Sequence, residues 1–479
     1  MSDHGWMSTV NEVVADDRWA AGRVDDETWG AAGRGPDLSA LPLLDHHCHG
    51  VVTRDLDRPA FEALLTEGTS AGPRGGSLFD SGIGMEVRRR CAPVLGLDPF
   101  ASPDAYLARR AELGWFEVSR RFLVGAGLSA LFVDTGLAGP TLLNSPGGLD
   151  APTAPAGRAA DVLPAQTADS DPARDHAVDP EHALIPTWSP VPLTDPSLLG
   201  RLADVPTRTV LRLETIAEEL AAEQIEPGDF PDRIAAAIER LAPGVVAAKT
   251  IAGYRCGLAL PARQASRAAL VHAVSVFLGT ARADLARANH AQRRESRPDA
   301  DHASPAPPSS MRPRLIDPTI IRFLIGCAVD NGLPLQVHTG FGDADLNLGE
   351  SDPVLLTPLL RELASTGVPI LLLHTYPYQR HAGYLAQVFD NVFCDVGLAI
   401  PHTGHRAHHA LAELLELAPY GKVLYSSDAY GLPELFYLGA VLFRQSLSRL
   451  LGDMALPADE AARIGLMIAQ GNAQRVYHR

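Results

Sequence analysis

The stretch LPLLDHHCH, residues 41–49, is an apolar run that ends in histidines, and three later segments repeat its design. LQVHTG at 335–340 and ILLLHT at 370–375 each place His-Thr after an apolar run, and VLYSSD at 423–428 ends in an aspartate. Buried strands that deliver His and Asp to their C-terminal ends are what a metal site at the mouth of a parallel β/α barrel requires. The four segments therefore predict an architecture and a site together.

Strand and helix patterns alternate along the rest of the chain. Strands without hydrophobic alternation, separated by helices, are typical of a parallel sheet that is covered on both faces. Eight such units favour an α/β fold closed as a (β/α)8 TIM-like barrel over an open doubly wound sheet. The predicted strands are residues 41–47, 129–134, 209–213, 245–251, 334–338, 369–374, 392–395 and 422–427.

Helical patterns lie before and between these strands. The first begins with Ser102 as N-cap and Pro103 at the first helical position, both of which favour a helix start. The predicted helices are residues 103–125, 232–241, 262–288, 318–331, 353–365, 381–389, 407–417 and 433–450.

The chain is predicted to form one large domain with an N-terminal extension and two insertions. Residues 1–40 are an N-terminal extension of helical character, and residues 41–479 form the barrel. Two stretches, about 144–196 and 293–313, are rich in Pro and Ala and have no hydrophobic period, so we expect irregular insertions there.

Composition narrows the classes of partner. With 41 basic and 57 acidic residues, the formal net charge is −16, which disfavours nucleic acid and anionic membranes as partners. No apolar run approaches the roughly 20 residues that span a bilayer, and residues 1–35 lack the regions of a signal peptide. Five scattered cysteines indicate reduced thiols rather than a disulfide framework. We therefore expect a cytoplasmic protein, with self-association into a homo-oligomer left open.

Five side chains are candidate metal ligands. His47 and His49 lie two residues apart on a strand end, so both imidazoles point to the same side. His338, His374 and Asp428 each follow an apolar strand. Taken singly, each histidine could be a satisfied core residue and Asp428 a helix cap. Their joint occurrence at one end of one barrel favours a metal centre.

Lys249 is a sixth candidate. It follows Val245-Val246-Ala247-Ala248, which places its ammonium inside the barrel mouth, where burial favours the neutral amine. A neutral amine beside two cations can react with carbon dioxide to give a carbamate that bridges them. The alternative is an ion pair with an inward carboxylate such as Glu214.

These segments resemble the amidohydrolase superfamily, in particular its metal-dependent TIM-barrel hydrolases of the amidohydrolase-2 type. The amidohydrolase-like half of nodulin/glutamine-synthetase fusion proteins is especially similar. The resemblance extends over about 41–477 outside the two insertions. The matching pieces are DHHCH (45–49), KTIAGYRCGL (249–258), HTGFGD (338–343), HTYPY (374–378), AGYLA (382–386), SSD (426–428) with PE (433–434), and GNA (471–473) with Tyr477.

The resemblance implies a metal-dependent amidohydrolase with one or two divalent ions, zinc by preference and manganese or iron as alternatives. It implies that His47, His49 and Asp428 hold the first metal, and that His338 and His374 hold a second or orient the substrate. Lys249, if carbamylated, would bridge the metals. Asp428 would take a proton from a metal-activated water and pass it to the leaving amine. The catalytic residues expected on this basis are Asp428, Lys249 and His374.

Further residues are candidates for substrate binding. Arg255 can clamp a carboxylate. The resemblance to proteins associated with glutamine metabolism implies a γ-glutamyl amide as substrate, with Arg255 holding its α-carboxylate. A structural salt bridge is the alternative for Arg255, and a turn-forming role for Asp343. Tyr254, Asp343, Tyr378 and Glu434 lie just beyond predicted strand ends. Asp395 ends a strand without a histidine and is not counted as a ligand.

Two other classes of function remain. Metal-dependent decarboxylases and isomerases share the ligand set, and Lys249 favours hydrolysis over them. A non-catalytic barrel would be expected to have lost a ligand, and the sequence retains all of them.

Overall fold

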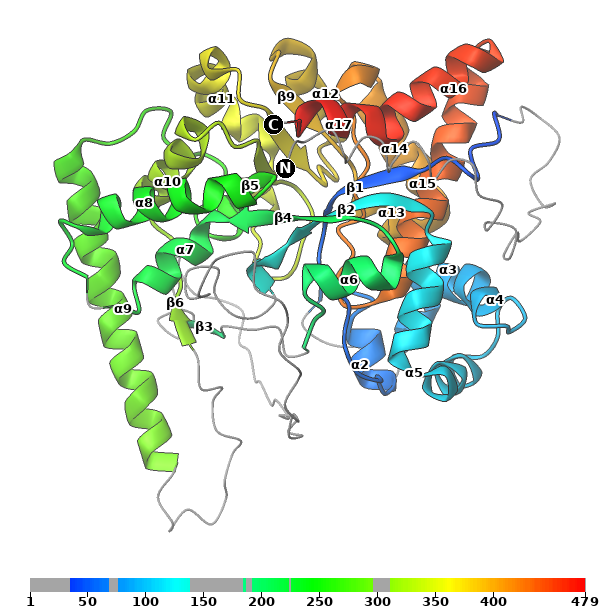
Figure 1. The fold of residues 1–479 in the computed structure, drawn as a ribbon, viewed down its shortest axis with the longest axis horizontal. Coiled ribbons are helices and arrows are strands. Elements are labelled where there is room, and N and C mark those ends of the chain that lie inside the picture. Colours follow the sequence, from blue (N-terminus) through cyan, green and yellow to red (C-terminus); the bar gives the residue numbers. More distant parts are fainter. Residues whose placement is uncertain are drawn as a thin grey trace.

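Seven strands follow one another around a single parallel sheet in the order β1-β2-β4-β5-β7-β8-β9 (Figure 1). The computed structural model describes residues 35–68, 76–137, 184–186, 192–223, 225–295 and 311–478. The strands are β1 (Leu43–Cys48), β2 (Leu128–Asp134), β4 (Thr207–Arg212), β5 (Ala247–Thr250), β7 (Leu335–His338), β8 (Ile370–Leu373) and β9 (Val392–Cys394). The sheet curls, and the prediction of an α/β TIM-like barrel is confirmed.

The predicted eighth strand, 422–427, is not a regular strand, yet it lies between the two edges of the sheet. The Leu424 amide donates to the Cys394 carbonyl at 3.1 Å, and the His46 amide donates to the Tyr425 carbonyl at 3.2 Å. Regular pairing stops because side chains take the neighbouring backbone groups. Asn472 Nδ2 binds the carbonyl of residue 423, and Asp45 Oδ1 binds the amide of residue 427.

Helices separate the strands in sequence and cover the outside of the sheet (Figure 1). They are α2 (Arg58–Ala63), α3 (Gly82–Glu86), α4 (Ala92–Val94), α5 (Pro103–Gly125), α6 (Pro196–Ala203), α7 (Leu213–Leu220), α8 (Phe230–Leu241), α9 (Arg267–Glu295), α10 (Pro318–Asp330), α11 (Thr357–Leu363), α12 (Gln379–Val388), α13 (Ala399–Thr403), α14 (Ala407–Leu415), α15 (Pro433–Asp453), α16 (Ala458–Leu466) and α17 (Asn472–Val476).

Helix starts follow local chemistry. The predicted start of α5 is confirmed, with the Ser102 side chain accepting from the amide of residue 105. Helix α10 begins in the same way, with Asp317 as N-cap and Pro318 at its first turn. The predicted helix at 353–365 is broken, because α11 is flanked by 3-10 turns at 353–356 and 364–366.

Two apolar layers hold the fold together. The larger lies between the sheet and the helices and includes Leu43, Cys48 and Phe122. The smaller fills the inside of the barrel and includes Leu44, Phe132 and, from the C-terminal end of the chain, Tyr477. Side chains therefore close the barrel below its mouth.

Some predictions lie partly outside the described residues. Residues 1–34 of the extension are outside them, and residues 35–40 contain no helix. Most of the two insertions, residues 144–183 and 296–310 among them, is outside as well. Their described parts are not wholly irregular, because β3 (Leu184–Pro186) pairs antiparallel with β6 (Met311–Pro313). Among the described helices, no segment combines the length and apolar character that crossing a bilayer requires.

Candidate metal centre

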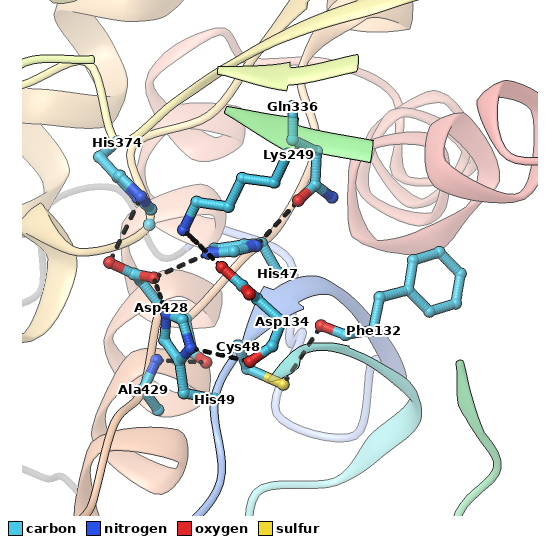
Figure 2. A network of polar contacts seen from close by, with 12 residues as sticks. His47, Cys48, His49, Phe132, Asp134, Lys249, Gln336, His374, Asp428 and Ala429 are labelled. Atoms are coloured by element: carbon cyan, nitrogen blue, oxygen red, sulfur yellow. Dashed lines mark hydrogen bonds and ion pairs between the residues drawn. The ribbon is translucent and has the colours of Figure 1, made fainter. Parts of the chain in front are cut away.

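Three histidines at the mouth of the barrel surround one carboxylate (Figure 2). Asp428 Oδ1 lies 3.0 Å from His47 Nε2 and 3.4 Å from His49 Nε2. Asp428 Oδ2 lies 3.3 Å from His374 Nε2. The histidines come from β1, the turn after it and the turn after β8, and Asp428 follows the eighth segment. Curling of the sheet therefore brings together residues that are far apart in sequence.

A bulge in β1 explains why consecutive histidines enter the barrel. The register with β2 shifts between Asp45 and Cys48, and an extra residue breaks the alternation of faces. His46 and His47 both make hydrogen bonds to side chains inside the barrel, whereas Cys48 packs in the outer apolar layer. His49 then returns to the inner side. Alternation counted from the inward-facing Leu44 would have placed His46 inside and His47 outside, so the extra residue turns His47 inward.

The turns that present two of the ligands are in the left-handed region of backbone space. Asp428 has φ 50°, His374 φ 70° and Thr375 φ 53°. Such values are uncommon for residues other than glycine, and they cluster at functional sites. Hydrogen bonds hold these turns. The His374 amide donates to Asp395 Oδ1 at 2.9 Å, and the Asp428 amide donates to the His47 carbonyl at 3.0 Å.

Lys249 lies inside the mouth, as predicted from its position on β5, but its partner differs from the one considered. Its Nζ is 2.7 Å from His47 Nε2 and 3.2 Å from Asp134 Oδ2. The same Asp134 oxygen lies 2.6 Å from Arg212 Nη2. Glu214 instead accepts hydrogen bonds from the turn after β5. A Lys–Asp–Arg cluster thus lines one side of the site.

Burial favours the neutral form of His47, His338 and His374. Burial, helped by Lys249, lowers the pKa of His47 to about 3. Burial also lowers the pKa of His338 well below its ordinary value, and that of His374 in the same direction. Lys249 has a lowered pKa because it is buried, although two carboxylates oppose the shift. Neutral imidazole is the form that binds a metal.

Two carboxylates at the mouth stay ionised. Burial acts to raise the pKa of Asp134, but the charges of Arg212 and Lys249 outweigh it and leave the pKa well below its ordinary value. Burial opposes ionisation of Asp428 as well, and the surrounding imidazoles lower its pKa well below the ordinary value. The site therefore combines negative oxygen donors with neutral nitrogen donors.

His338 completes the mouth from β7. Its ring centroid lies 4.8 Å from that of His374 and 4.5 Å from that of Tyr254. Its Nε2 is buried and has no hydrogen-bond partner among the described residues. A buried polar atom without a partner costs free energy unless a ligand satisfies it.

The donor set fits a divalent cation. Two groups of side chains bring ligand atoms within 4.8 Å of one another, His47–His374–Asp428 and His47–His49–Asp134. Imidazole nitrogen and carboxylate oxygen are ligands that zinc and its neighbours prefer. The unpartnered His338 Nε2 adds a further donor on the same side.

Two predicted substrate contacts, Tyr254 and Asp343, lie beside this centre. The Tyr254 hydroxyl would be only 1.9 Å from a Cβ added at Gly342, and His338 Nε2 would be 3.1 Å from it. The absence of a side chain at Gly342 thus lets the hydroxyl lie next to the ligand. Asp343 Oδ1 accepts from the amide of residue 345 at 2.9 Å, which is the turn-forming role considered from the sequence.

Three other predicted substrate contacts are engaged elsewhere. Arg255 Nη2 lies 3.1 Å from Glu218 Oε1, so this guanidinium forms the structural salt bridge that was the alternative. Glu434 is fully buried, with Oε1 2.7 Å from Arg110 Nε, because α15 packs against α5. The Tyr378 hydroxyl donates to a backbone carbonyl at 3.0 Å. The structure does not bring Glu434 to the mouth.

Two residues of the site were missed, although the sequence held a signal for both. Asp134 ends an apolar strand, which is the same pattern that singled out Asp428. Gln336 lies two residues before His338 on β7 and so shares its inward face. Its Oε1 is 2.9 Å from His47 Nδ1.

Comparison with known proteins agrees with this geometry. The amidohydrolase family pattern (Amidohydro_2) matches residues 227–479. Protein fluG of Emericella nidulans is 38% identical over 150 residues, which make up 30% of this chain and 17% of that protein. The present chain therefore corresponds to a small part of that relative.

One solved structure shares the fold over nearly the whole chain. A Lactobacillus casei ATCC 334 protein described as a metal-dependent hydrolase superimposes with a TM-score of 0.65, over 93% of this chain and 98% of that one, at 22% identity. A uronate isomerase from Bacillus halodurans C-125 is more distant, with a TM-score of 0.49 at 14% identity over 92% and 94% of the two chains. Since the family pattern covers more than half of the sequence and includes His338, His374 and Asp428, the chain belongs to the amidohydrolase family.

Proposed function

We propose that this chain is a metal-dependent hydrolase that cleaves an amide or a related carbon–nitrogen bond of a small molecule with water. The observation that supports this most directly is the convergence of His47, His49 and His374 on Asp428 at the barrel mouth. Neutral imidazoles beside an ionised carboxylate are suited to holding a divalent cation. Membership of the amidohydrolase family supports the same reaction class.

Each residue has a distinct part in this proposal. His47, His49 and Asp428 would hold one divalent cation, and His338 with His374 would hold a second or orient the substrate. Zinc is the preferred ion, with manganese or iron as alternatives. When bound, such a cation polarises a carbonyl and lowers the pKa of a water molecule. Asp428, kept ionised by its surroundings, can accept the proton of the attacking water and return it to the leaving amine.

We also propose that Lys249 becomes a carbamate. Its lowered pKa favours the neutral amine, whose nitrogen attacks carbon dioxide. A nitrogen–carbon bond forms, one carbon–oxygen π bond breaks, and a proton leaves the nitrogen for solvent. The product places a second carboxylate beside Asp134, an arrangement that needs cations between the two negative charges.

The preferred substrate class is a small carboxylated amide, such as a γ-glutamyl amide. Arg255 is the proposed carboxylate clamp, and its Nε has no hydrogen-bond partner among the described residues. Its Nη2, however, is already paired with Glu218. Arg255→Met therefore tests the clamp. An unchanged kcat/KM for a carboxylated amide, with activity otherwise intact, would rule it out.

Metal analysis tests the proposal directly. Protein produced in medium supplemented with zinc or manganese should contain about two metals per chain, and Lys249→Ala should lower that number. A single metal, unaffected by Lys249→Ala, would instead favour decarboxylase or isomerase chemistry on the same barrel. No bound metal at all would leave only a non-catalytic barrel.

A screen of γ-glutamyl and other amides for released amine identifies the reaction. Activity should disappear when the metal is removed with a chelator and return when it is added back. A chelator-resistant activity would contradict the metal-dependent mechanism, because the proposed water activation depends on the cation.

A further inference from the structure

A chain of hydrogen bonds lies beneath the metal centre and begins at the C-terminal end of the protein. Tyr477 follows α17 directly, and its ring packs inside the barrel at 5.0 Å from that of Phe132. Its hydroxyl lies 2.9 Å from His46 Nδ1 and 2.8 Å from Gln336 Nε2. All these side chains are buried. A tyrosine remote from the mouth in sequence thus reaches the layer directly below it.

One branch of this chain ends at His47. Gln336 Nε2 donates to the Tyr477 hydroxyl and, at 2.7 Å, to the His46 carbonyl, so both amide hydrogens are used. Gln336 Oε1 is then an acceptor, and it lies 2.9 Å from His47 Nδ1. His47 must therefore carry its proton on Nδ1. The lone pair of Nε2 is left facing Asp428 and Lys249.

The other branch ends at His374. Because the Tyr477 hydroxyl accepts from the glutamine, its own proton is directed to His46 Nδ1. His46 Nε2 lies 3.0 Å from Asp395 Oδ2, an ion-pair contact rather than a formed hydrogen bond. Asp395 Oδ1 accepts from the His374 amide at 2.9 Å, in the turn that has left-handed φ. Asp395, which was not counted as a ligand, thus has a supporting contact instead.

We propose that Tyr477 and Gln336 are positioning residues for metal binding, which fix the protonated nitrogen of His47 and, through His46 and Asp395, brace the turn of His374. This inference rests on the proposed function, since it requires His47 and His374 to be ligands. Hydrogen bonds to the outer nitrogen of a metal-binding histidine set its tautomer and orientation, and losing them typically weakens metal affinity by about 10–100-fold.

The test is Tyr477→Phe, which removes one hydroxyl and keeps the ring. Tyr425→Phe is a matched control, because Tyr425 is also fully buried but its hydroxyl has no hydrogen-bond partner among the described residues. Dissociation constants for Zn²⁺ and Co²⁺ are measured on the full chain by competition with a chelator. We expect about 10–100-fold weaker binding for Tyr477→Phe, and a changed visible spectrum of the Co²⁺-loaded protein. Tyr425→Phe should match the unmodified chain.

The possible outcomes distinguish failure of the proposed function from failure of the positioning role. If the unmodified chain binds neither ion, the proposed function itself fails. If it binds and Tyr477→Phe has the affinity and spectrum of Tyr425→Phe, the positioning role is overturned. Should Tyr477→Phe not fold, Gln336→Met replaces it. That change leaves the Tyr477–His46 contact in place but removes the acceptor of His47 Nδ1, so the same loss of affinity is expected, and an unchanged affinity overturns the inference.

Discussion

Two buried charge clusters in this molecule look alike in sequence and differ in the structure. At the barrel mouth, Asp428 is surrounded by imidazoles, and the nearby His338 Nε2 has no hydrogen-bond partner among the described residues. Between α5 and α15, Glu434 is bonded through Oε1 and Oε2 to Arg110, at 2.7 and 3.3 Å, and through Oε1 to Tyr106 at 2.8 Å. The first cluster contains a buried nitrogen that is free to bind a ligand, whereas in the second both carboxylate oxygens are already hydrogen-bonded.

The difference teaches how to separate a site from a structural pair. Both Asp428 and Glu434 follow apolar segments and both are buried, so sequence alone places them together. A buried ion pair that is fully hydrogen-bonded has no remaining capacity for a ligand. Several unpartnered buried polar atoms gathered at one place, in contrast, are able to bind a ligand. Substitutions in each cluster test this distinction.

The largest expected effect is that of Asp428→Asn on catalysis. The amide keeps the shape of the side chain but cannot accept the proton of the attacking water, so kcat should fall by about 10²–10⁴-fold. Steady-state kinetics on an amide found in the screen measures this. Asp232→Asn is the control, because Asp232 is exposed and is paired with Arg267. Full activity of Asp428→Asn would show that the mouth cluster is not the reaction centre.

Glu434→Gln should have the opposite profile. It leaves the Arg110 guanidinium buried without its counter-charge, which lowers the free energy of unfolding by about 3–5 kcal/mol. The kcat of the protein that remains folded should not change. Denaturant unfolding provides the measurement. Glu117 forms a partly exposed ion pair with Arg121 on α5, the helix that also carries Arg110, and Glu117→Gln should lower the free energy of unfolding by less than about 1 kcal/mol. A fall in kcat without loss of stability would return Glu434 to the substrate site.

The barrel and most of the mouth could be predicted from the sequence because their signals are local. Apolar runs that end in His or Asp mark strand ends, and parallel strands bring those ends together. The rest depends on contacts that no local pattern encodes. The bulge that turns His47 inward results from the register with β2. The pairing of Glu434 with Arg110 depends on how two helices pack, and that of Arg255 with Glu218 on how the turn after β5 packs against α7.

Gly342→Ala tests whether the position of Tyr254 at the barrel mouth matters for activity. An added Cβ would lie 1.9 Å from the Tyr254 hydroxyl, which must then move away from His338. A displacement of about 1 Å in a substrate-positioning group can lower kcat/KM by up to about 10²-fold. Gly349→Ala in the same loop is the control, since its nearest neighbour is 3.7 Å away. If Tyr254 is the group displaced, Gly342→Ala should add little loss to a Tyr254→Phe background.

The smallest expected effect is that of Glu67, a carboxyl group whose pKa is affected by the charges at the barrel mouth. Burial and the charges of Asp428 and Asp343 raise its pKa to about 8, from an ordinary value of 4.5. Between these two values the folded chain keeps a proton that the unfolded chain has lost. Stability must therefore decrease as pH rises through this window and level off above it.

Glu67→Gln should remove this contribution. The melting temperature of the metal-free variant should then fall less than that of the unmodified chain between about pH 5 and about pH 8, the range in which the two pKa values differ. The difference in stability between the two proteins should be well below that expected for a fully buried carboxyl group, because 30% of the Glu67 side chain is exposed. Glu416→Gln is the control, since Arg380 lowers the pKa of that exposed carboxyl. Identical pH profiles for Glu67→Gln and the unmodified chain would mean that neither burial nor the negative charge at the mouth raises the pKa of Glu67.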